Sequence, residues 1–509
     1  MSVIIVGAGP TGLMLAGDLA EAGVPVRVLE KRAHESNLTR AFALHARSLE
    51  YLDARGLADR LVSESFPVPE VRADLGKGRV VRLDLRHPES RFPFVLMIQQ
   101  ARTEARLLER AERQGAKIVR GAEVIDLSEQ DGGVSLRVLE GGRERFERAD
   151  YVVGADGAHS KIREKLGVPF EGRSYRTHLL LADVRLHEVL TPAITPMIGS
   201  DGVALLTPFG DGWFRATVWD RRQARVPLEE PLQFEEIAES LRRLSRSALH
   251  LEEVRWSSRF LTERRHARYY RRGRVFLAGD AAHVHSPMGA MGMSVGLQDA
   301  GNLSWKLAAV HHGWAPQWLL DSYERERKPI ARRTIYVSGF ILSLAVAPAI
   351  IRAVRPYLVP AITSVPRIAE SARLLISGLG YGYGAPAGVP NAPRTGERVG
   401  DHPILPKLEG RNARSGESKG AGSTRRLYEV MDGIRFVLID STRSKEIEEA
   451  SRAWSDRLIF ATSEEPLLND LGVLLIRPDG HLAWSAHRPD RAGLLRALEA
   501  WLGPAQKSR

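Results

Sequence analysis

The sequence of 509 residues contains no cysteine. This absence excludes disulfides, thiolate metal sites, iron–sulfur clusters and catalysis by a thiol. A chain without cysteine fits a reducing compartment, and its N-terminus enters an apolar strand pattern without the basic region that opens a signal peptide. We therefore expect a cytoplasmic protein.

Long apolar runs are scarce, and internal repeats are absent. The segment closest to a membrane span, Tyr336 to Ile351, is short for a bilayer and contains Pro348. A buried or interfacial helix is the better interpretation, so we expect no stable membrane insertion. Transient association with a membrane surface is left open.

The charge is unbalanced but not clustered. The formal net charge is +11, yet Lys and Arg are spread along the chain among 62 acidic residues, with no basic tail or aromatic–basic module. This distribution argues against nucleic-acid binding. A positive field that attracts anionic ligands, such as phosphorylated cofactors, explains the charge equally well.

The first thirty residues carry the clearest motif. An apolar run ending at Val6 leads into Gly7-Ala8-Gly9-Pro10-Thr11-Gly12, and a helix-forming segment from Leu13 to Ala22 follows. A second apolar run then ends at Glu30. Strand, glycine-rich turn, helix and strand in this order predict a dinucleotide-binding unit, whereas an ordinary glycine-rich turn is the alternative.

Each glycine of this motif has a physical role in that prediction. Gly7 makes the tight turn, Gly9 lets the backbone approach a pyrophosphate, and Gly12 lets the helix pack closely on the strand. The helix N-terminus points free N–H groups at the phosphates. Glu30 lies 18 residues beyond Gly12, where an acid can bind a ribose hydroxyl.

Two later strand ends also carry an acid. Asp156-Gly157 follows an apolar run, and Gly279-Asp280 follows another and precedes a glycine-rich loop that opens a long helix. Ligands of open α/β sheets bind outside the C-terminal ends of the strands. Glu30, Asp156 and Asp280 together suit one long cofactor lying across the sheet, which favours FAD over NAD.

The remaining patterns divide the chain further. Residues Arg40 to Arg55 have helical spacing, the region from about 170 to 270 alternates as an antiparallel sheet does, and residues 385 to 425 resemble a linker. A compact α/β unit follows from Arg426. Lys306 is expected to face solvent or an acid on its own helix.

With these motifs in place, the whole chain resembles the flavin-dependent aromatic hydroxylases related to p-hydroxybenzoate hydroxylase. More narrowly, it is similar to the FAD-dependent hydroxylases that tailor aromatic polyketides and to rifampicin monooxygenase. The motifs that carry the resemblance are Gly7–Gly12; Arg40 with Leu44-His45-Ala46-Arg47-Ser48; Gln100 before Thr103-Glu104; Asp156-Gly157; Gly279-Asp280 with Pro287; and Asp299-Ala300 with Asn302-Leu303 and Trp305-Lys306-Leu307.

The resemblance implies an α/β fold in three domains. The first is a Rossmann-like FAD-binding domain formed by residues 1–170 and 271–385, and the second is an antiparallel-sheet substrate domain at 171–270. The third, at 386–509, is a linker with a thioredoxin-like domain. Because this domain has no cysteine, it cannot perform thiol–disulfide chemistry, and a packing or dimerisation role, with a homodimer as one outcome, is expected.

The resemblance also implies roles for single residues. Glu30, with Lys31 nearby, would hold the adenosine ribose, and Asp156 would serve both FAD and the nicotinamide cofactor. The other implied FAD contacts are Arg40 and Gln100 at the pyrophosphate and ribityl region, Val124 at the adenine, Asp280 at the ribityl-pyrophosphate portion, and the backbone of Gly292, Met293 and Ser294 at the isoalloxazine edge, with Pro287 in the same loop.

The activity that the resemblance implies is NADPH- and FAD-dependent monooxygenation. A flavin C4a-hydroperoxide would hydroxylate a polycyclic, phenolic, polyketide-like aromatic substrate with O2. A Baeyer–Villiger or ring-opening oxygenase is the alternative within enzymes, and a non-catalytic flavoprotein that binds an aromatic ligand is the alternative outside them. No catalytic base is assigned.

The loop at the flavin ring departs from the family pattern. Family members usually carry Gly-Gly-Gln-Gly-Met-Asn, whereas this chain has Gly289-Ala290-Met291-Gly292-Met293-Ser294. The backbone donors survive this change, but contacts from the amide side chains do not.

Two other residue groups have competing interpretations. His283 and His285 could be a metal pair, but no third ligand stands at suitable spacing, so no metal is expected. The tryptophans at 213, 219 and 256 are either residues of the sheet core and face or a stacking surface for an aromatic substrate.

Overall fold

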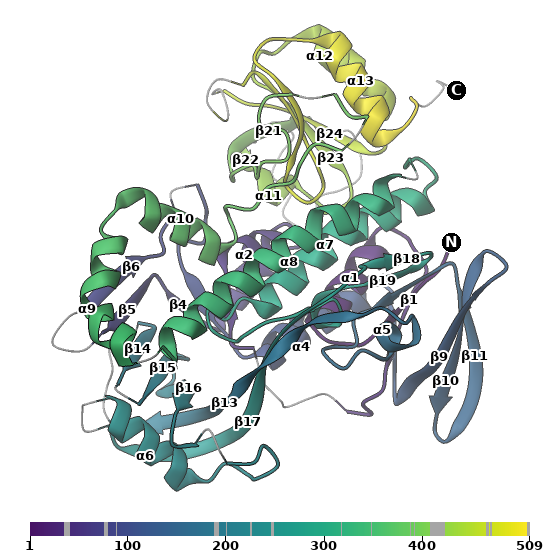
Figure 1. The fold of residues 1–509 in the computed structure, drawn as a ribbon. Coiled ribbons are helices and arrows are strands. Elements are labelled where there is room, and N and C mark those ends of the chain that lie inside the picture. Colours follow the sequence, from purple (N-terminus) through teal and green to yellow (C-terminus); the bar gives the residue numbers. More distant parts are fainter. Residues whose placement is uncertain are drawn as a thin grey trace.

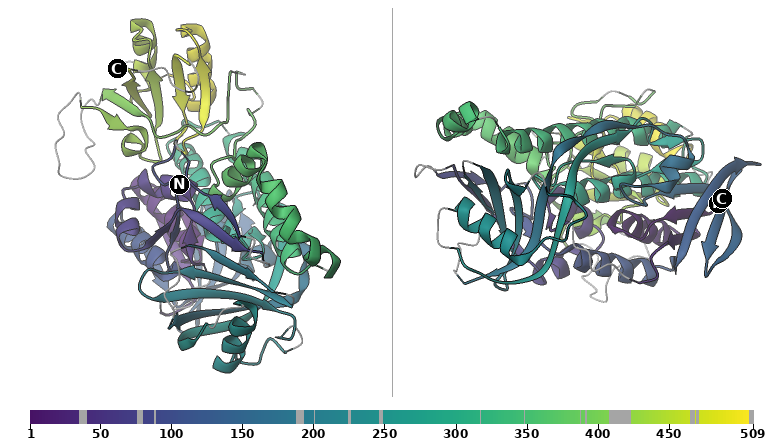
Figure 2. Two further views of the ribbon diagram at one scale, coloured as in Figure 1. Left: turned by 90° about the vertical axis from the view of Figure 1, so that its left-hand side faces the viewer. Right: turned by 60° about the horizontal axis from the view of Figure 1, so that its bottom comes forward.

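The computed structural model arranges the protein in three parts, with a parallel sheet and its helices between a large antiparallel sheet and a C-terminal domain (Figure 1). Figure 2 shows the same order from the side. The structure describes the whole chain except residues 35–40, 76–79, 88, 188–192, 200, 224–225, 246–248, 317, 348, 387, 391, 408–422, 465–467, 469–470 and 506–509.

The central sheet is parallel apart from one edge strand. Its middle strand β1 is apolar and fully buried, and Val6 at its end pairs with Gly154 on one side and Leu29 on the other. Because the strands are parallel, the turns that bear Glu30, Asp156 and Asp280 lie at one edge. The strands in spatial order are β18 (Arg271–Arg272, antiparallel), β19 (Val275–Leu277), β12 (Tyr151–Gly154), β1 (Val3–Val6), β2 (Val26–Glu30) and β8 (Lys117–Arg120).

Helices cover this sheet, and small sheets flank it. Helix α1 (Pro10–Glu21) packs between α4 (Gln100–Arg113) and α7 (Gly292–His311). The predicted helix from Arg40 to Arg55 is shorter than expected, because a strand precedes it and α2 begins only at Ala46. The other elements here are β3 (Ala43–Leu44), α2 (Ala46–Asp53), α3 (Ala58–Ser63), β4 (Phe66–Val68), β7 (Val95–Met97), β9 (Ala122–Gln130), β10 (Gly133–Glu140), β11 (Arg143–Ala149) and α5 (Lys161–Lys165).

The region from 170 to 270 forms the predicted antiparallel sheet, with eight strands in all. Three of these strands come from outside that region: β5 and β6 join one end, where β5 runs parallel to β14, and β20 joins the other end. Helix α6 was not predicted. Apolar residues of α6 pack on the sheet. The elements are β20 (His283–Val284), β17 (Leu251–Ala267), β13 (Phe170–Leu186), β16 (Trp213–Asp220), β15 (Gly202–Pro208), β14 (Thr195–Ile198), β5 (Glu70–Asp74), β6 (Val80–Asp84) and α6 (Phe234–Ser245).

Three helices continue the chain after α7. They are α8 (Trp318–Ala345), α9 (Ala349–Thr363) and α10 (Pro366–Ser377). Among the described residues, none of the helices combines the length and the hydropathy that crossing a bilayer requires.

The C-terminal domain contains a mixed six-stranded sheet with helices α12 and α13 packed together. Strand β21 lies inside the predicted linker yet pairs with β24, so this part of the linker belongs to the sheet. The elements are β22 (Arg425–Arg426), β21 (Pro403–Lys407), β24 (Leu458–Thr462), β23 (Phe436–Asp440), β25 (Val473–Ile476), β26 (Leu482–Ala486), α11 (Leu427–Val430), α12 (Lys445–Ser451) and α13 (Arg491–Leu502).

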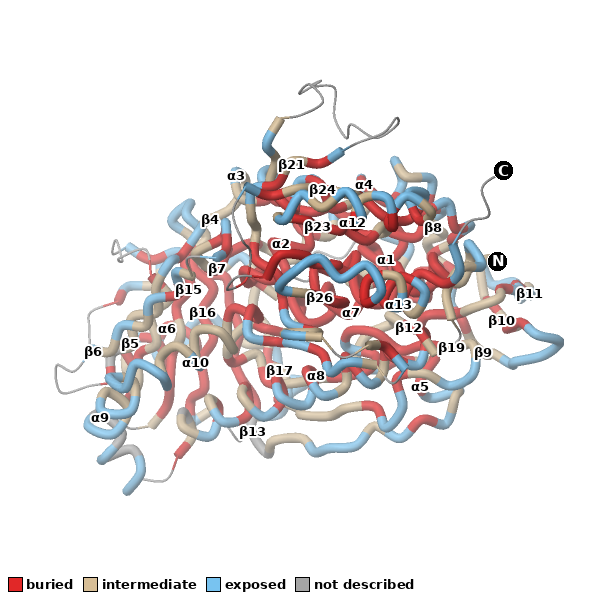
Figure 3. Tube along the Cα trace, turned by 90° about the horizontal axis from the view of Figure 1, so that it is seen from above, coloured by how far each residue is buried: buried red, intermediate tan, exposed pale blue. Residues whose placement is uncertain are grey.

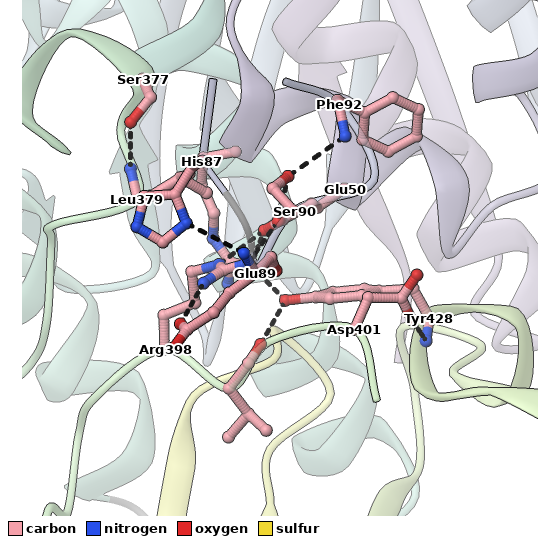
Figure 4. A network of polar contacts seen from close by, with 12 residues as sticks. Glu50, His87, Glu89, Ser90, Phe92, Ser377, Leu379, Arg398, Asp401 and Tyr428 are labelled. Carbon is pink, nitrogen blue, oxygen red and sulfur yellow. Dashed lines mark hydrogen bonds and ion pairs between the residues drawn. The ribbon is translucent and has the colours of Figure 1, made fainter. Parts of the chain in front are cut away.

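Buried ion pairs join this domain to the rest of the protein. Glu50 of α2 accepts hydrogen bonds from Arg398, at 2.6 and 2.9 Å, and from Ser90 at 2.9 Å (Figure 4). Arg47 donates to the hydroxyl of Tyr428 at 2.6 Å. The buried charge of Glu50 is therefore offset by an arginine of the C-terminal domain, and the buried charge of that arginine is offset by Glu50.

Lys306 was expected to face solvent or an acid on its own helix, and both expectations are wrong. Its side chain is fully buried, and its ammonium donates to Glu326 of the next helix at 2.7 Å. Burial lowers the pKa of Lys306 to about 8 despite this carboxylate. Glu326 is shared with Arg477 of the C-terminal domain at 2.8 Å.

Candidate cofactor site

The turn between β1 and α1 is packed so closely that two of its glycines have no room for a side chain. A Cβ on Gly7, where φ is +106°, would lie less than 3.0 Å from the carbonyl group of Ala155, after strand β12. A Cβ on Gly12 would overlap the carbonyl oxygen of Gly7. These glycines hold the first helix against the sheet, as the motif predicted.

Gly9 differs from its two neighbours in the motif. Among the described residues beyond its chain neighbours, no atom lies within 4 Å of the position that its Cβ would take, and its φ of −78° is open to any residue. It caps the N-terminus of α1, where Pro10 is the first helical residue. An open backbone at a helix N-terminus fits a pyrophosphate.

Thr11 connects this turn to the region around Gly279. Its hydroxyl lies 2.7 Å from the Cβ position of Gly279, and it also crowds the Cβ position of Gly296 in α7. The β1–α1 turn therefore lies directly against the Gly279–Asp280 turn and helix α7, because the two glycines leave room for Thr11. A single ligand can reach both turns.

Glu30 ends strand β2 and is 4% exposed. Its carboxylate accepts hydrogen bonds from the backbone N–H of Ala8 at 2.8 Å and from the backbone and Nε of Arg32 at 2.9 and 2.8 Å. Burial opposes ionisation, but these hydrogen bonds outweigh it and lower the pKa of Glu30. Lys31 is exposed beside it. An ionised acceptor in this place fits the predicted ribose contact, and Arg32 is a neighbour that the sequence did not identify.

Asp156 lies at the N-terminus of α5. Its carboxylate accepts hydrogen bonds from Ser160 Oγ at 2.5 Å and from the N–H groups of Lys161 and Ile162 at 2.7 and 3.1 Å. Burial raises the pKa of Asp156 against these hydrogen bonds. In this structure Asp156 positions α5, and its predicted contact with cofactor stays a prediction.

The Gly279–Asp280 turn is fixed by a carboxylate that the sequence analysis gave no role. Asp299 of α7, which is fully buried, accepts from Gly279 N at 3.0 Å, His283 Nε2 at 2.7 Å and Arg327 Nε at 2.7 Å. Burial opposes its ionisation, but His283 and Arg327 lower its pKa. Asp280 itself is exposed at the sheet edge. His283 is therefore a partner of Asp299, and no cluster of three metal-ligand side chains occurs among the described residues.

The loop before α7 and the first residues of that helix, Pro287–Ser294, are together called the α7 loop. It turns through a hydrogen bond from Ala290 N to Pro287 O at 2.9 Å, and Ala290 has a φ of +52°. Helix α7 begins at Gly292, so the N–H groups of Gly292, Met293 and Ser294 belong to its first turn and have no acceptor within an α-helix. These are the donors predicted at the flavin ring.

Residues at the start of α2 hold the α7 loop in place. His45 donates its backbone N–H to Ser294 Oγ at 3.2 Å, and its Nε2 lies 3.0 Å from the carbonyl oxygen of Gly289. Ser48 Oγ donates to the carbonyl oxygen of Ser294 at 3.1 Å. The motif containing His45 and Ser48 carried the resemblance, yet their contact with the loop was not predicted.

Both histidines beside the loop are neutral at pH 7. Burial lowers the pKa of His45 and of His285 to about 4. Because Nε2 of His45 faces a carbonyl, it carries the proton, which makes Nδ1 an acceptor. His45 Nδ1 and His285 Nε2 are buried and have no hydrogen-bond partner among the described residues. Unpaired polar atoms of this kind fit a site built for a bound polar group.

Three further predicted contacts have different outcomes. Gln100 accepts from Ala41 N at 3.0 Å and donates to Glu104 at 2.8 Å, at the start of α4. The Val124 side chain is buried in the core, so only its backbone is available to an adenine. Arg40 lies outside the described residues.

An apolar cluster with one buried ion pair lies against the α7 loop. Phe42, Val95 and Met97 form its centre, and Phe209 and Ala290 pack against it. Arg215, which is fully buried, pairs with Asp183 at 2.5 Å. Its guanidinium lies over three rings, those of Trp256 at 4.9 Å, Phe42 at 5.4 Å and Phe209 at 5.8 Å.

Comparisons with known proteins agree with this arrangement. Residues 1–338 match the model of the FAD binding domain, and residues 406–505 match that of the aromatic-ring hydroxylase C-terminal domain. The chain is 36% identical to rifampicin monooxygenase of Streptomyces venezuelae, over 99% of both chains. It is 34% identical to 12-dehydrotetracycline 5-monooxygenase/anhydrotetracycline 6-monooxygenase of Streptomyces rimosus, again over 99% of both chains.

A solved structure confirms the fold over the full length. The anhydrotetracycline hydroxylase OxyS of Streptomyces rimosus superposes with a TM-score of 0.84 at 33% identity and covers 99% of both chains. The turns at the sheet edge, the antiparallel sheet and the C-terminal domain thus occur together in one family. The chain belongs to the FAD-binding aromatic-ring hydroxylases, a family of flavoprotein monooxygenases, and its cofactor is FAD.

Proposed function

We propose that this protein hydroxylates a polycyclic, phenolic aromatic compound with NADPH and O2. The balance is one substrate C–H, O2, NADPH and a proton giving the phenol C–OH, NADP⁺ and water. When bound, FAD takes two electrons from NADPH and activates O2 for transfer of one oxygen atom. The chain must then orient the two reactants and exclude water from them.

One observation carries the proposal: the α7 loop lies, through Ala290, against the apolar cluster that contains Phe42, beside Phe209 and buried Arg215. First-turn N–H groups of α7 would face the carbonyl edge of the flavin ring, where negative charge develops on reduction. The apolar cluster, which lies against the α7 loop, would bind the flat substrate next to the flavin ring. Arg215 is the cation there that can orient a phenolate or ring carbonyl, and Asp183 holds its guanidinium.

We further propose how the chain holds the cofactor. The open backbone at Gly9 and the N-terminus of α1 receive the pyrophosphate, and Glu30 accepts a hydrogen bond from the adenosine ribose. Asp280 accepts hydrogen bonds in the ribityl region. Neutral His45 keeps its Nε2 proton on the carbonyl of Gly289, so it positions the α7 loop and leaves Nδ1 as an acceptor toward the site.

The names of relatives support a polycyclic substrate. Rifampicin monooxygenase and the tetracycline monooxygenases are named for polycyclic compounds. The apolar cluster suits a substrate of this class better than a small carboxylate, because Asp183 pairs with Arg215 at 2.5 Å and with Arg255 at 3.6 Å and so offsets part of their charge. The individual compound is the object of the experiment below.

A second function has an observation in its favour. The dialkyldecalin synthase of Streptomyces rugosporus is 30% identical over 99% of both chains, and its name describes ring formation. A structure described as a Diels-Alderase, PyrE3, superposes with a TM-score of 0.79 at 28% identity. On this alternative the protein binds FAD and an apolar substrate, and it promotes ring closure in that substrate without consuming NADPH.

The experiment that tests the proposal uses the flavin-loaded protein and a panel of polycyclic phenols. We expect at least one compound to stimulate NADPH oxidation and to gain one oxygen atom, labelled when ¹⁸O2 replaces O2. Arg215→Gln should raise KM for that compound more than Phe146→Ser, a control on exposed strand β11. A flavin-bound protein that converts compounds without NADPH or labelled oxygen would establish the second function instead.

A further inference from the structure

Helices α8, α9 and α10 expose most of the large apolar side chains on the described surface. Ten of the sixteen exposed large hydrophobic residues lie in this one stretch of the chain. Figure 3 shows α9 at the periphery, with much of its length exposed. We call these ten exposed residues the α9 face. They are 42% to 81% exposed and comprise Tyr336, Phe340, Ile350, Ile351, Val354, Tyr357, Leu358, Ile362, Val365 and Ile368.

The spacing of these residues shows that the apolar stripe of α9 points outward. Ile350, Val354, Leu358 and Ile362 recur every four residues and thus share one side of the helix. Helices of water-soluble proteins ordinarily turn such a stripe toward the core. Ile350 is instead 81% exposed. A contiguous apolar surface of this kind marks an interaction site.

The charge of this stretch restricts the partner. From residue 328 to residue 369 the chain contains six Lys or Arg residues and no Asp or Glu. Arg332, Arg333 and Arg367 are exposed there. The acids that flank the stretch are engaged, since Glu326 pairs with Lys306 and Glu370 pairs with Arg373.

A second copy of this chain fits such a face poorly. In a twofold dimer the same patch meets itself, so the basic residues would face one another without acids to offset them. An anionic lipid surface instead offers phosphates to the arginines and acyl chains to the isoleucines and leucine. Amphipathic helices with these two features lie in the membrane interface.

We propose that the α9 face binds the surface of a bilayer that contains anionic lipids. The contact is peripheral, because neither α9 nor its neighbours are long and apolar enough to span. Exposed isoleucine and leucine side chains would enter the headgroup boundary, while arginines hold lipid phosphates. The proposal is independent of the reaction that the flavin site performs.

Flotation of the full-length, flavin-loaded protein with lipid vesicles tests this proposal. We expect partition onto vesicles of equal parts phosphatidylglycerol and phosphatidylcholine, and weaker partition onto phosphatidylcholine alone or at high salt. Ile350→Ser combined with Leu358→Ser should weaken partition about tenfold or more. Arg367→Gln should weaken it about fivefold. All three positions are exposed, so the flavin spectrum and unfolding temperature should stay unchanged.

Phe146→Ser is the matched control, because Phe146 is 75% exposed on β11, far from α9 in Figure 1. It should float as the wild type does. Absence of flotation, equal binding to both vesicle types, or an equal loss in Phe146→Ser would overturn the proposal. A dimer in sedimentation that Ile350→Ser and Leu358→Ser dissociate, without vesicle binding, would assign the face to a second copy.

Discussion

The β1–α1 turn and the α7 loop both belong to the candidate cofactor site, but different interactions hold them in place. The turn is held by backbone packing at Gly7 and Gly12, where no side chain fits. The α7 loop is held by hydrogen bonds from His45 and Ser48, side chains about 245 residues away in the sequence. The turn therefore depends on backbone contacts within itself and with Ala155 after β12, whereas the α7 loop depends on side chains of α2.

The way in which each part is held also determines how the turn and the loop respond to substitution and to pH. Steric packing of backbone has no titratable group and tolerates no added atom, so we expect abrupt loss when it is altered. A loop held by side-chain hydrogen bonds should loosen in small steps, each about 1 kcal/mol, and should respond to pH where a histidine takes part.

The largest expected effect comes from Gly12→Ala compared with Gly9→Ala. The Cβ at position 12 would overlap the carbonyl oxygen of Gly7, so Gly12→Ala should abolish both folding and FAD binding. The Cβ at position 9 meets no described atom within 4 Å, so Gly9→Ala should fold normally. It should still weaken FAD binding by about tenfold to a hundredfold, because its methyl group stands where a phosphate is proposed. Circular dichroism and flavin titration measure the two effects. Full FAD affinity in folded Gly9→Ala would contradict the proposed pyrophosphate position.

The next effect concerns Asp299, the buried carboxylate that fixes the Gly279–Asp280 turn. Asp299→Asn removes the charge that offsets buried Arg327, so we expect the free energy of unfolding to fall by about 3–5 kcal/mol. Denaturant unfolding measures the change. Asp321→Asn is the control, because Asp321 forms an exposed pair with Arg271 and should change stability by no more than about 1 kcal/mol. An equally small effect in both variants would show that Asp299 does not hold the turn.

A smaller effect is expected from pH, and of these two parts of the site it should involve the α7 loop. The pKa of His45 is lowered to about 4 in the folded protein, so the unfolded chain binds more protons between pH 6.5 and 4. Stability is therefore full above pH 6.5 and falls as pH drops, by about 2 kcal/mol for this histidine at pH 5. Beside the β1–α1 turn, hydrogen bonds from Arg32 and Ala8 lower the pKa of Glu30, which favours its ionised form in the folded protein.

His45→Gln keeps a donor for Gly289 and removes the titration. The variant should lose about 2 kcal/mol less than the wild type between pH 7 and pH 5, measured by denaturant unfolding at each pH. His34→Gln, at an exposed position, should follow the wild-type curve. Identical pH profiles for His45→Gln and the wild type would mean that His45 is not a neutral, buried group.

Features set by local sequence patterns could be predicted, whereas contacts set by tertiary packing could not. The β1–α1 turn, the acid-bearing strand ends and the antiparallel sheet follow from local patterns of glycine and apolar residues, and the structure confirms their elements. Lys306 was misjudged because its partners, Glu326 and Arg477, stand on another helix and in another domain. Asp299 and His45 lay within recognised motifs, yet their contacts are set by tertiary packing, which no local pattern records. Helix α6 was not predicted, although Ile237, Leu241 and Leu244 recur at helical spacing within it.

The smallest expected effect is that of Ser48→Ala. Ser48 is fully buried, and its hydroxyl donates to the carbonyl oxygen of Ser294 at 3.1 Å, inside the α7 loop. Losing this hydrogen bond should cost about 1 kcal/mol of stability, because the carbonyl is left without that donor. We expect unchanged FAD affinity but a larger share of NADPH oxidation that yields hydrogen peroxide without product, since a looser loop positions the flavin ring less well. Peroxide and product are measured in the same assay. Ser63→Ala, which removes an exposed hydroxyl that donates to Arg60 O in its own helix, is the control and should leave that share unchanged. If Ser48→Ala lowered FAD affinity as strongly as Gly9→Ala does, the two parts of the site would not be separable, and the distinction between a packed turn and a hydrogen-bonded loop would fail.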